Sequence, residues 1–154
     1  MKTLQLPQNR YTTIDDDDYE KINKWKWRTN EYGYAFRTAK RNGKKQILFL
    51  HREILGLKKG DGKIIDHKNR NTLDNRKCNL RICNRSQNRM NSKAKSIIGY
   101  KGVSWHVSSK KWLARIEKNK TSIRIGMFNN PKDAAKAYDE KAIEFFGEFA
   151  CTNF

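Results

Sequence analysis

Residues 66–88, DHKNRNTLDNRKCNLRICNRSQN, are the stretch from which the fold of this chain is most directly predicted. A short strand at 63–65 (KII) runs into it, a polar loop rich in Asn and Asp follows, and 79–82 (NLRI) predicts a second strand. Asn84 has Gln87 three residues later, which is the capping-box spacing that starts a helix. The expected order is therefore strand, loop, strand and helix.

The same stretch carries a carboxylate, an imidazole and two amides: Asp66, His67, Asn79 and Asn88. Phosphodiester hydrolysis requires a base that activates water and a cation that offsets charge on the phosphate. Asp66 and Asn88 offer oxygen ligands of the kind that Mg²⁺ or Mn²⁺ prefers. His67 can accept a proton because an unperturbed imidazole has a pKa of about 6.5. Asn79 can hold the loop backbone and orient His67. This pattern indicates a metal-dependent nuclease without a small-molecule cofactor.

Each of these side chains also has a plainer interpretation. Taken alone, His67 would more often be a surface or hydrogen-bonded histidine, and Asp66 could pair with a nearby lysine. Asn79 would be a loop residue and Asn88 a solvated helix position. For His51, upstream of the stretch, a structural hydrogen bond is the expected role.

The charge of the chain points to a polyanion as the partner. The 154 residues include 34 Lys and Arg against 16 Asp and Glu, which leaves a formal net charge of +18. Residues 40–95 alone carry 17 basic and four acidic side chains, a net of +13 around the suspected site. Such an excess favours DNA or RNA, or an anionic membrane surface. No apolar run approaches the roughly 20 residues that span a bilayer, and no signal peptide stands out, so we expect a cytoplasmic protein without a membrane partner.

The three cysteines, Cys78, Cys83 and Cys151, form no CxxC pair. We therefore expect neither a structural zinc nor a disulfide, and we take Cys78 and Cys83 for small, partly buried residues.

The rest of the chain predicts a small N-terminal α/β part and a separate C-terminal part. Acidic residues at 15–18 suit a helix start, and Tyr19, Ile22 and Trp25 follow at helical spacing. The further N-terminal elements expected are strands at 33–39 and 46–50 joined by a turn at Asn42-Gly43, and a helix at 51–57.

Three alternating segments, at 99–107, 110–118 and 121–128, predict an antiparallel sheet. Pro131 then opens a helix whose apolar face would cover that sheet. The expected class is α+β, with domains at 1–92 and 97–154 and a linker at 93–96.

The central stretch resembles the HNH nuclease motif, a ββα-metal fold, in the branch of phage homing endonucleases. The resemblance rests on the Asp-His pair, LDNR at 73–76, NLR at 79–81 and SQN at 86–88, and with the upstream text it covers residues 10–92. It implies His67 as general base, Asp66 and Asn88 as metal ligands, and Asn79 as the loop-fixing asparagine. Many HNH enzymes have a histidine where Asn88 stands, so this chain is less suited to zinc or nickel.

The C-terminal part resembles an AP2 domain, through YKGV at 100–103, KKWLARI at 110–116, IGMF at 125–128 and the segment 131–154. The sheet of that family lies in the major groove of duplex DNA, which makes double-stranded DNA the expected partner. In this chain Arg124 occupies a position where the plant pattern has tryptophan. The residues expected to contact DNA are Arg81, Arg85, Arg89, Lys101, Trp105, Lys111, Arg115, Glu117 and Arg124. Trp105 and Trp112 could instead be packed, and His106 could contact DNA or be merely exposed.

The leading prediction is a metal-dependent endonuclease of duplex DNA, in which a monomer nicks and cleavage of both strands requires a homodimer or a second event. A non-catalytic DNA-binding regulator with a degenerate HNH fold is the second hypothesis, and an RNA-binding protein is the third.

Overall fold

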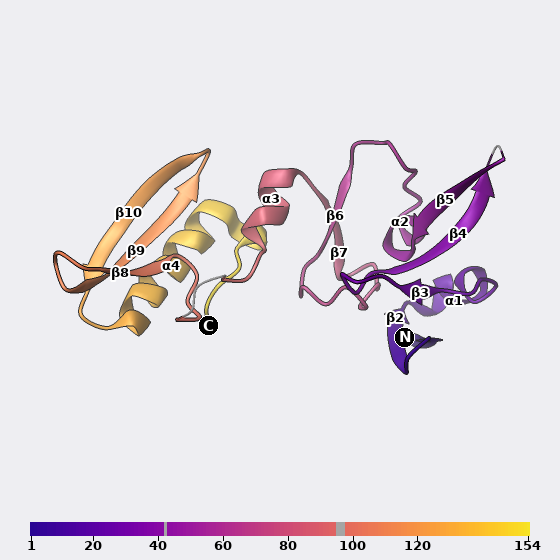
Figure 1. Ribbon diagram of the computed structural model, residues 1–154, viewed down its shortest axis with the longest axis horizontal. Coiled ribbons are helices and arrows are strands. Elements are labelled where there is room, and N and C mark those ends of the chain that lie inside the picture. The colour runs from indigo at the N-terminus through magenta and orange to yellow at the C-terminus, as the bar shows by residue number, and fades with distance from the viewer. Residues whose placement is uncertain (42, 95–97) are drawn as a thin grey trace. The chain divides into compact units, whose positions relative to one another are not determined.

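The computed structural model describes residues 1–154 apart from residue 42 and residues 95–97 (Figure 1). The predicted turn at Asn42-Gly43 and part of the predicted linker at 93–96 fall outside these described residues. The chain divides into two compact units, Met1–Arg85 and Ser86–Phe154. This division lies earlier in the chain than the predicted linker.

The first unit contains three small antiparallel sheets and two short helices. The sheets pair β1 with β2, β3 with β4 and β5, and β6 with β7. Their strands and helices are β1 (Lys2–Leu6), β2 (Arg10–Ile14), α1 (Asp16–Ile22), β3 (Arg28–Thr29), β4 (Ala35–Arg41), β5 (Lys44–Phe49), α2 (Leu50–Ile54), β6 (Ile64–His67) and β7 (Leu80–Cys83). The core of the unit gathers around Ile14, Ile22 and Leu50, each fully buried.

The N-terminal end of this unit differs from the prediction in two ways. The β1–β2 hairpin was not predicted, although alternation points Leu4 and Leu6 inward. The predicted helix is also shorter, since α1 ends at Ile22 and Trp25 lies beyond it, 52% exposed. Trp27 is buried instead, and its indole Nε1 donates to the carbonyl of Ile22 at 2.9 Å. The same carbonyl accepts from the backbone N–H of Trp25 at 3.2 Å, so the last carbonyl of the helix has two donors.

The second unit is a three-stranded antiparallel sheet, in the order β10-β9-β8, packed against one long helix. The predicted strands at 110–118 and 121–128 agree closely with β9 and β10. Its elements are α3 (Arg85–Met90), which starts at the last residue of the first unit, β8 (Val103–His106), β9 (Lys111–Lys118), β10 (Thr121–Phe128), α4 (Pro131–Phe146) and the 3₁₀ helix η1 (Gly147–Phe149).

Small residues on α4 allow the sheet to approach the helix closely. Ala134, Ala135 and Ala142 are fully buried, and Tyr138 is 4% exposed. At Gly102, where φ is +75°, an added Cβ would come within 2.0 Å of the Tyr138 ring, so only glycine suits that position. Pro131 opens α4, as predicted, because its missing N–H would be unpaired there in any case.

The architecture is a mixed α and β chain with several small antiparallel sheets and few helices, which confirms that part of the prediction. Within the described ranges, no helix is long and apolar enough to cross a membrane.

Candidate functional site

The β6–β7 pair carries the first two predicted site residues. Asp66 and His67 are the last residues of β6, the strand that was predicted to run into them, and they pair with Arg81 and Leu80 of β7. Asp66 is 6% exposed and His67 is 4% exposed. Two polar side chains so deeply buried require internal partners, since an unpaired buried polar group is destabilising.

The partner of Asp66 is Arg81, across the strand pair. Arg81 donates from Nε at 2.8 Å and from Nη2 at 2.6 Å, and both bonds end on the same carboxylate oxygen, Oδ2. The two side chains are only 8% and 7% exposed. The alternative interpretation of Asp66, as the partner of a nearby basic residue, named a lysine, and the residue found is an arginine. The predicted contact of Arg81 with DNA does not fit this placement, because a buried, paired guanidinium cannot reach a phosphate without leaving Asp66.

Asn79 lies directly before β7 and bonds to the loop that precedes it. Its side-chain Oδ1 accepts from the backbone N–H of Asn69 at 3.0 Å, and its Nδ2 donates to the carbonyl of Asp74 at 2.7 Å. Its own carbonyl accepts from the N–H of Lys68 at 2.9 Å. Both ends of the amide thus hold the 68–79 loop in one conformation.

His67 is held by Asn75, a residue to which the sequence alone assigned no role. The Nε2 atom of His67 lies 3.2 Å from Oδ1 of Asn75, and Asn75 is 1% exposed. On its other side, Nδ2 of Asn75 donates to the hydroxyl of Thr12 at 2.8 Å. The Thr12 hydroxyl in turn donates to the carbonyl of Leu73 at 2.8 Å.

This chain of bonds determines the tautomer of His67. The Thr12 hydroxyl donates its one hydrogen to the carbonyl of Leu73. The Thr12 oxygen therefore acts as the acceptor for the amide nitrogen of Asn75. The amide oxygen of Asn75 therefore faces His67, and Nε2 of His67 must carry the hydrogen. In the neutral ring, Nδ1 is then the basic nitrogen.

Two aromatic rings lie close to the buried side chain of His67. The ring of Tyr34 lies 5.9 Å from that of His67, and His51 lies 5.5 Å away at an edge-on angle of 85°. Burial lowers the pKa of His67 from its ordinary value, because it disfavours the imidazolium, and the Asn75 bond and the Asp66 charge only partly oppose this. Burial, and secondarily Asp66, raises the pKa of Tyr34. The site therefore favours a neutral imidazole.

His51 is a second buried imidazole in the same cluster. It stacks on Phe49 with a 5.5 Å centroid distance and a 17° interplanar angle. Burial, followed by the charges of His67 and Arg52, lowers its pKa to about 3. Among the described residues its Nδ1 has no hydrogen-bond partner, so the predicted structural hydrogen bond is not made at that atom.

The fourth predicted site residue, Asn88, lies in α3 and belongs to the second unit. Its side chain is exposed, as are those of its helix neighbours Arg85 and Arg89. Among the residues that the structure describes, no group of three or more His, Cys, Asp or Glu side chains is arranged so that it could hold a metal ion. Of the free thiols, Cys78 is exposed and Cys83 is buried.

In the second unit, the sheet face opposite α4 carries charged side chains. Arg115 and Glu117 alternate along β9 with the buried Ala114 and Ile116. Arg124 of β10 pairs directly with Arg115. All three charged residues are exposed, as is Lys111 at the start of β9. This open face is available to a large ligand.

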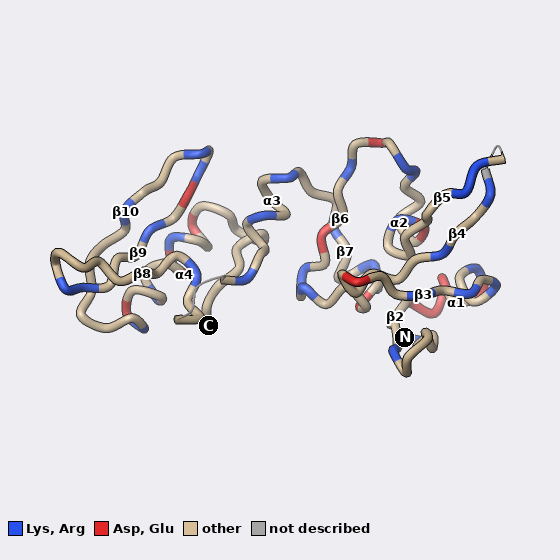
Figure 2. Tube along the Cα trace, viewed as in Figure 1, with Lys and Arg blue, Asp and Glu red and all other residues tan. Residues whose placement is uncertain are grey.

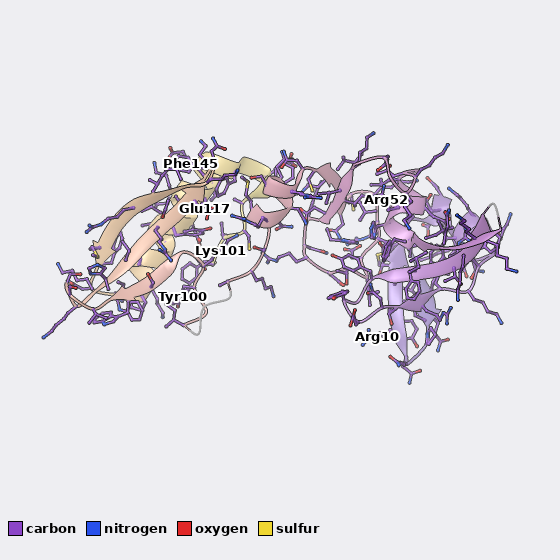
Figure 3. The ribbon with its side chains drawn as sticks, turned by 45° about the horizontal axis from the view of Figure 1, so that its top comes forward. Arg10, Arg52, Tyr100, Lys101, Glu117 and Phe145 are labelled. Carbon is purple, nitrogen blue, oxygen red and sulfur yellow. The ribbon has the colours of Figure 1, made fainter. Side chains whose placement is uncertain are left out.

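Other predicted DNA-contact residues in this unit have internal partners. The ammonium of Lys101, which is labelled in Figure 3, bonds to the carbonyl of Met90, and the backbone N–H of Lys101 donates to Asn153. Trp105 packs edge-on against Trp112 at 5.0 Å, on the helix side of the sheet, and remains 48% exposed. Arg89 and Glu117 form an exposed ion pair at 2.6 Å. For Lys101, a role in positioning the chain fits better than a free phosphate contact.

His106 lies at the end of β8 with Nδ1 2.9 Å from the Ser109 hydroxyl.

Three residues of the candidate site were not predicted from the sequence: Asn75, Thr12 and Tyr34. The only available signal was Asn75 in the run LDNR, because its partner Thr12 lies 63 residues upstream.

Two family models match the chain. The model of the HNH endonuclease matches residues 48–90, and that of the AP2 domain matches residues 98–148. The first match contains Asp66, His67, Asn75, Asn79 and Asn88.

Two curated proteins are similar to this chain. An uncharacterised HNH endonuclease of Acanthamoeba polyphaga mimivirus is 31% identical over 144 residues, which cover 93% of this chain and 74% of that protein. An ethylene-responsive transcription factor of Arabidopsis thaliana is 36% identical over 63 residues, which cover 40% of this chain and 15% of that protein.

Proposed function

Because the chain belongs to the HNH endonuclease family, we propose that it hydrolyses phosphodiester bonds of duplex DNA, using His67 as the base and Mg²⁺ or Mn²⁺ as the cation. In this proposal β6, β7 and α3 form a ββα-metal motif, and the AP2-like second unit holds the DNA. The observation that carries the proposal is the buried His67, held through Nε2 by Asn75 and adjacent to Asp66.

His67 acts as the general base through Nδ1. The hydrogen bond from Nε2 to Asn75 keeps the proton off Nδ1, and the lowered pKa keeps the ring neutral and able to accept a proton from water. Asn79 holds the loop that carries Asn75, so the orientation of the ring depends on both amides.

Asp66 and Asn88 are the proposed cation ligands. When bound, the cation offsets charge on the phosphate and on the departing 3′ oxygen. Arg81 orients the Asp66 carboxylate through two bonds to a single oxygen. A carboxylate has about four lone-pair positions, so two bonds to one oxygen are compatible with Asp66 also serving as a ligand.

The second unit supplies affinity for the duplex. The exposed guanidinium groups of Arg115 and Arg124 and the ammonium of Lys111 suit phosphates or guanine edges, and Glu117 suits the amino group of cytosine once it leaves its exposed ion pair with Arg89. Arg85 and Arg89 on α3 add exposed positive charge next to Asn88.

The test is cleavage of supercoiled plasmid by the full chain in Mg²⁺, in Mn²⁺ and in EDTA. We expect conversion to the nicked form with either metal and none in EDTA. His67→Ala should abolish nicking while DNA binding is retained. His106→Ala, a histidine variant outside the site, should cleave normally. Full activity of His67→Ala would overturn the mechanism.

A non-catalytic DNA-binding protein is the second candidate. The buried Asp66–Arg81 ion pair favours it, because a carboxylate committed to a guanidinium is a weaker metal ligand. In that case neither metal would produce cleavage, and Asp66→Asn would leave DNA binding unchanged.

A further inference from the structure

The first unit has a cleft that is separate from Asp66 and His67. It has a volume of about 870 Å³ and is bordered by the β4–β5 hairpin, by α2 and by the segment 56–63 that follows α2. None of the residues assigned above to catalysis or to metal binding lines it. A volume of this size accommodates a ligand of several ring systems but not the full width of a duplex.

The charge of the cleft is strongly positive. Its lining contains seven Lys and Arg side chains and two acidic ones, Glu53 and Asp61. Arg37 neutralises Glu53 through bonds of 3.1 and 2.6 Å, and Arg52, which is labelled in Figure 3, pairs with Asp61.

Five lysines of the lining take no part in these two ion pairs. Each is exposed and, within the part of the chain that the structure describes, none forms an ion pair; they are Lys21, Lys40, Lys58, Lys59 and Lys63. Figure 2 shows Lys and Arg residues, in blue, along the β4–β5 hairpin and on the segment after α2. The ammonium of Lys21 donates to the carbonyl of Glu53 at 3.3 Å, and the other four ammonium groups form a set that is complementary to a chain of phosphates.

The same cleft exposes two large apolar side chains. Trp25 is 52% exposed and Ile47 is 50% exposed. The guanidinium of Arg37 lies 4.2 Å from the centre of the Trp25 ring, and Glu53 holds that guanidinium in place. Arg37 therefore supports the Trp25 ring from one side. The Trp25 ring can then act as a rigid platform on which another flat ring stacks.

We propose that this cleft binds a single strand of DNA, with a base stacked on Trp25 and phosphates on the free lysines. Aromatic platforms in a basic groove are the chemistry by which proteins hold single strands, since every base has a face that stacks. The inference rests on the proposed function only for the source of the strand, which would be an end released at or near a nick.

The experiment measures binding of a fluorescent dT12 oligonucleotide to the full chain in EDTA, where no cleavage occurs. Each base stacked on an aromatic ring contributes about 1–3 kcal/mol, so Trp25→Ala should weaken binding by about 5- to 100-fold. The matched control is Tyr32→Ala, an aromatic of the same unit that is 72% exposed and does not line the cleft. It should bind as the wild type does.

A Lys58→Ala/Lys59→Ala double variant tests the phosphate contacts. For single strands each contact contributes about 0.7 to the slope of log K against log salt, so the slope should fall by about 1.4. A Lys132→Ala/Lys136→Ala variant on α4 removes the same charge elsewhere and should leave the slope unchanged.

Photocrosslinking of the wild type to a 5-iodouracil oligonucleotide provides a readout that needs no variant. The crosslinked peptide should contain Trp25. Crosslinks confined to other peptides, together with equal dT12 affinity of Trp25→Ala and Tyr32→Ala, would overturn the proposal. The proposal would also be overturned if Trp25→Ala lowered the affinity for an acidic peptide or for anionic vesicles but left the affinity for dT12 unchanged. A plasmid that stays uncut would refute the proposed nuclease function but not this site, because dT12 binding is measured without cleavage.

Discussion

The candidate site of the first unit buries its polar side chains, whereas the open sheet face of the second unit exposes them. Asp66, His67 and Asn75 are at most 6% exposed, and each has an internal partner. Arg115 and Arg124 are exposed on the sheet face opposite α4. Chemistry requires groups held in one geometry before the substrate arrives, whereas binding a polyanion requires charge that the polyanion can reach.

After the loss of nicking expected from His67→Ala, the largest effect is expected from Asp66→Asn. The change removes a proposed cation ligand, and metal ions supply several kcal/mol of transition-state stabilisation, so cleavage should fall by about 100-fold or more. It also leaves Arg81 charged, buried and unpaired, which should lower the free energy of unfolding by about 3–5 kcal/mol. Plasmid cleavage and urea unfolding check the two effects. Asp133→Asn, at an exposed position of α4, is the control, and near-normal cleavage by Asp66→Asn would contradict the assignment.

A smaller effect should follow from Asn75→Ala. Loss of this amide frees the His67 ring and leaves the Thr12 hydroxyl without its donor. Residues that orient catalytic groups typically contribute about 10- to 100-fold, and a buried group left unsatisfied costs about 1–3 kcal/mol of stability. Cleavage rate and urea midpoint measure both. Asn71→Ala, an exposed residue of the same loop, should change neither by a comparable amount.

The open face should respond differently, in affinity rather than in rate. Arg115→Ala and Arg124→Ala should each weaken duplex binding by about fivefold, corresponding to about 1 kcal/mol. For a phosphate contact, the salt slope should also fall by about 0.9 per arginine. Binding titrations at several salt concentrations give both quantities. If saturating protein does not restore the cleavage rate of these variants, the division of labour between the two units is wrong.

The smallest effect concerns acid sensitivity of the first unit. The pKa of His51 is about 3 in the folded protein, chiefly because of burial, against an ordinary value of 6.5. A lowered folded pKa contributes stability that is present above pH 6.5 and is lost as the pH falls from 6.5 towards 3. One pH unit below 6.5 should therefore lower the free energy of unfolding by about 1 kcal/mol. Urea midpoints at pH 7.5 and 5.5 check this, and His51→Phe should reduce the difference.

Local patterns predicted much of the fold. Strand alternation located β9 and β10, and proline at the first helical position located the start of α4. The β1–β2 hairpin was missed because its turn residues, Gln8 and Asn9, adopt positive φ without the glycine that usually signals such a turn. The end of α1 was misplaced because a tertiary bond from Trp27, rather than a local stop signal, closes the helix.

For the candidate site, the motif identified Asp66, His67 and Asn79 but not their partners. The link from Asn75 to Thr12 spans 63 residues, and the pairing of Asp66 with Arg81 depends on the register of β6 and β7. Neither the spacing of residues nor their chemistry reveals such contacts. The sequence therefore proposes which side chains carry the chemistry, whereas the side chains that hold them are found only in the structure.

The most direct test measures nicking in Mg²⁺ and duplex affinity in EDTA on the same preparations of the wild type, His67→Ala and the Arg115→Ala/Arg124→Ala double variant. We predict that His67→Ala binds as the wild type does and does not nick, while the double variant binds weakly and nicks at the normal rate once saturated. Wild-type nicking by His67→Ala, at unchanged affinity, would contradict the account.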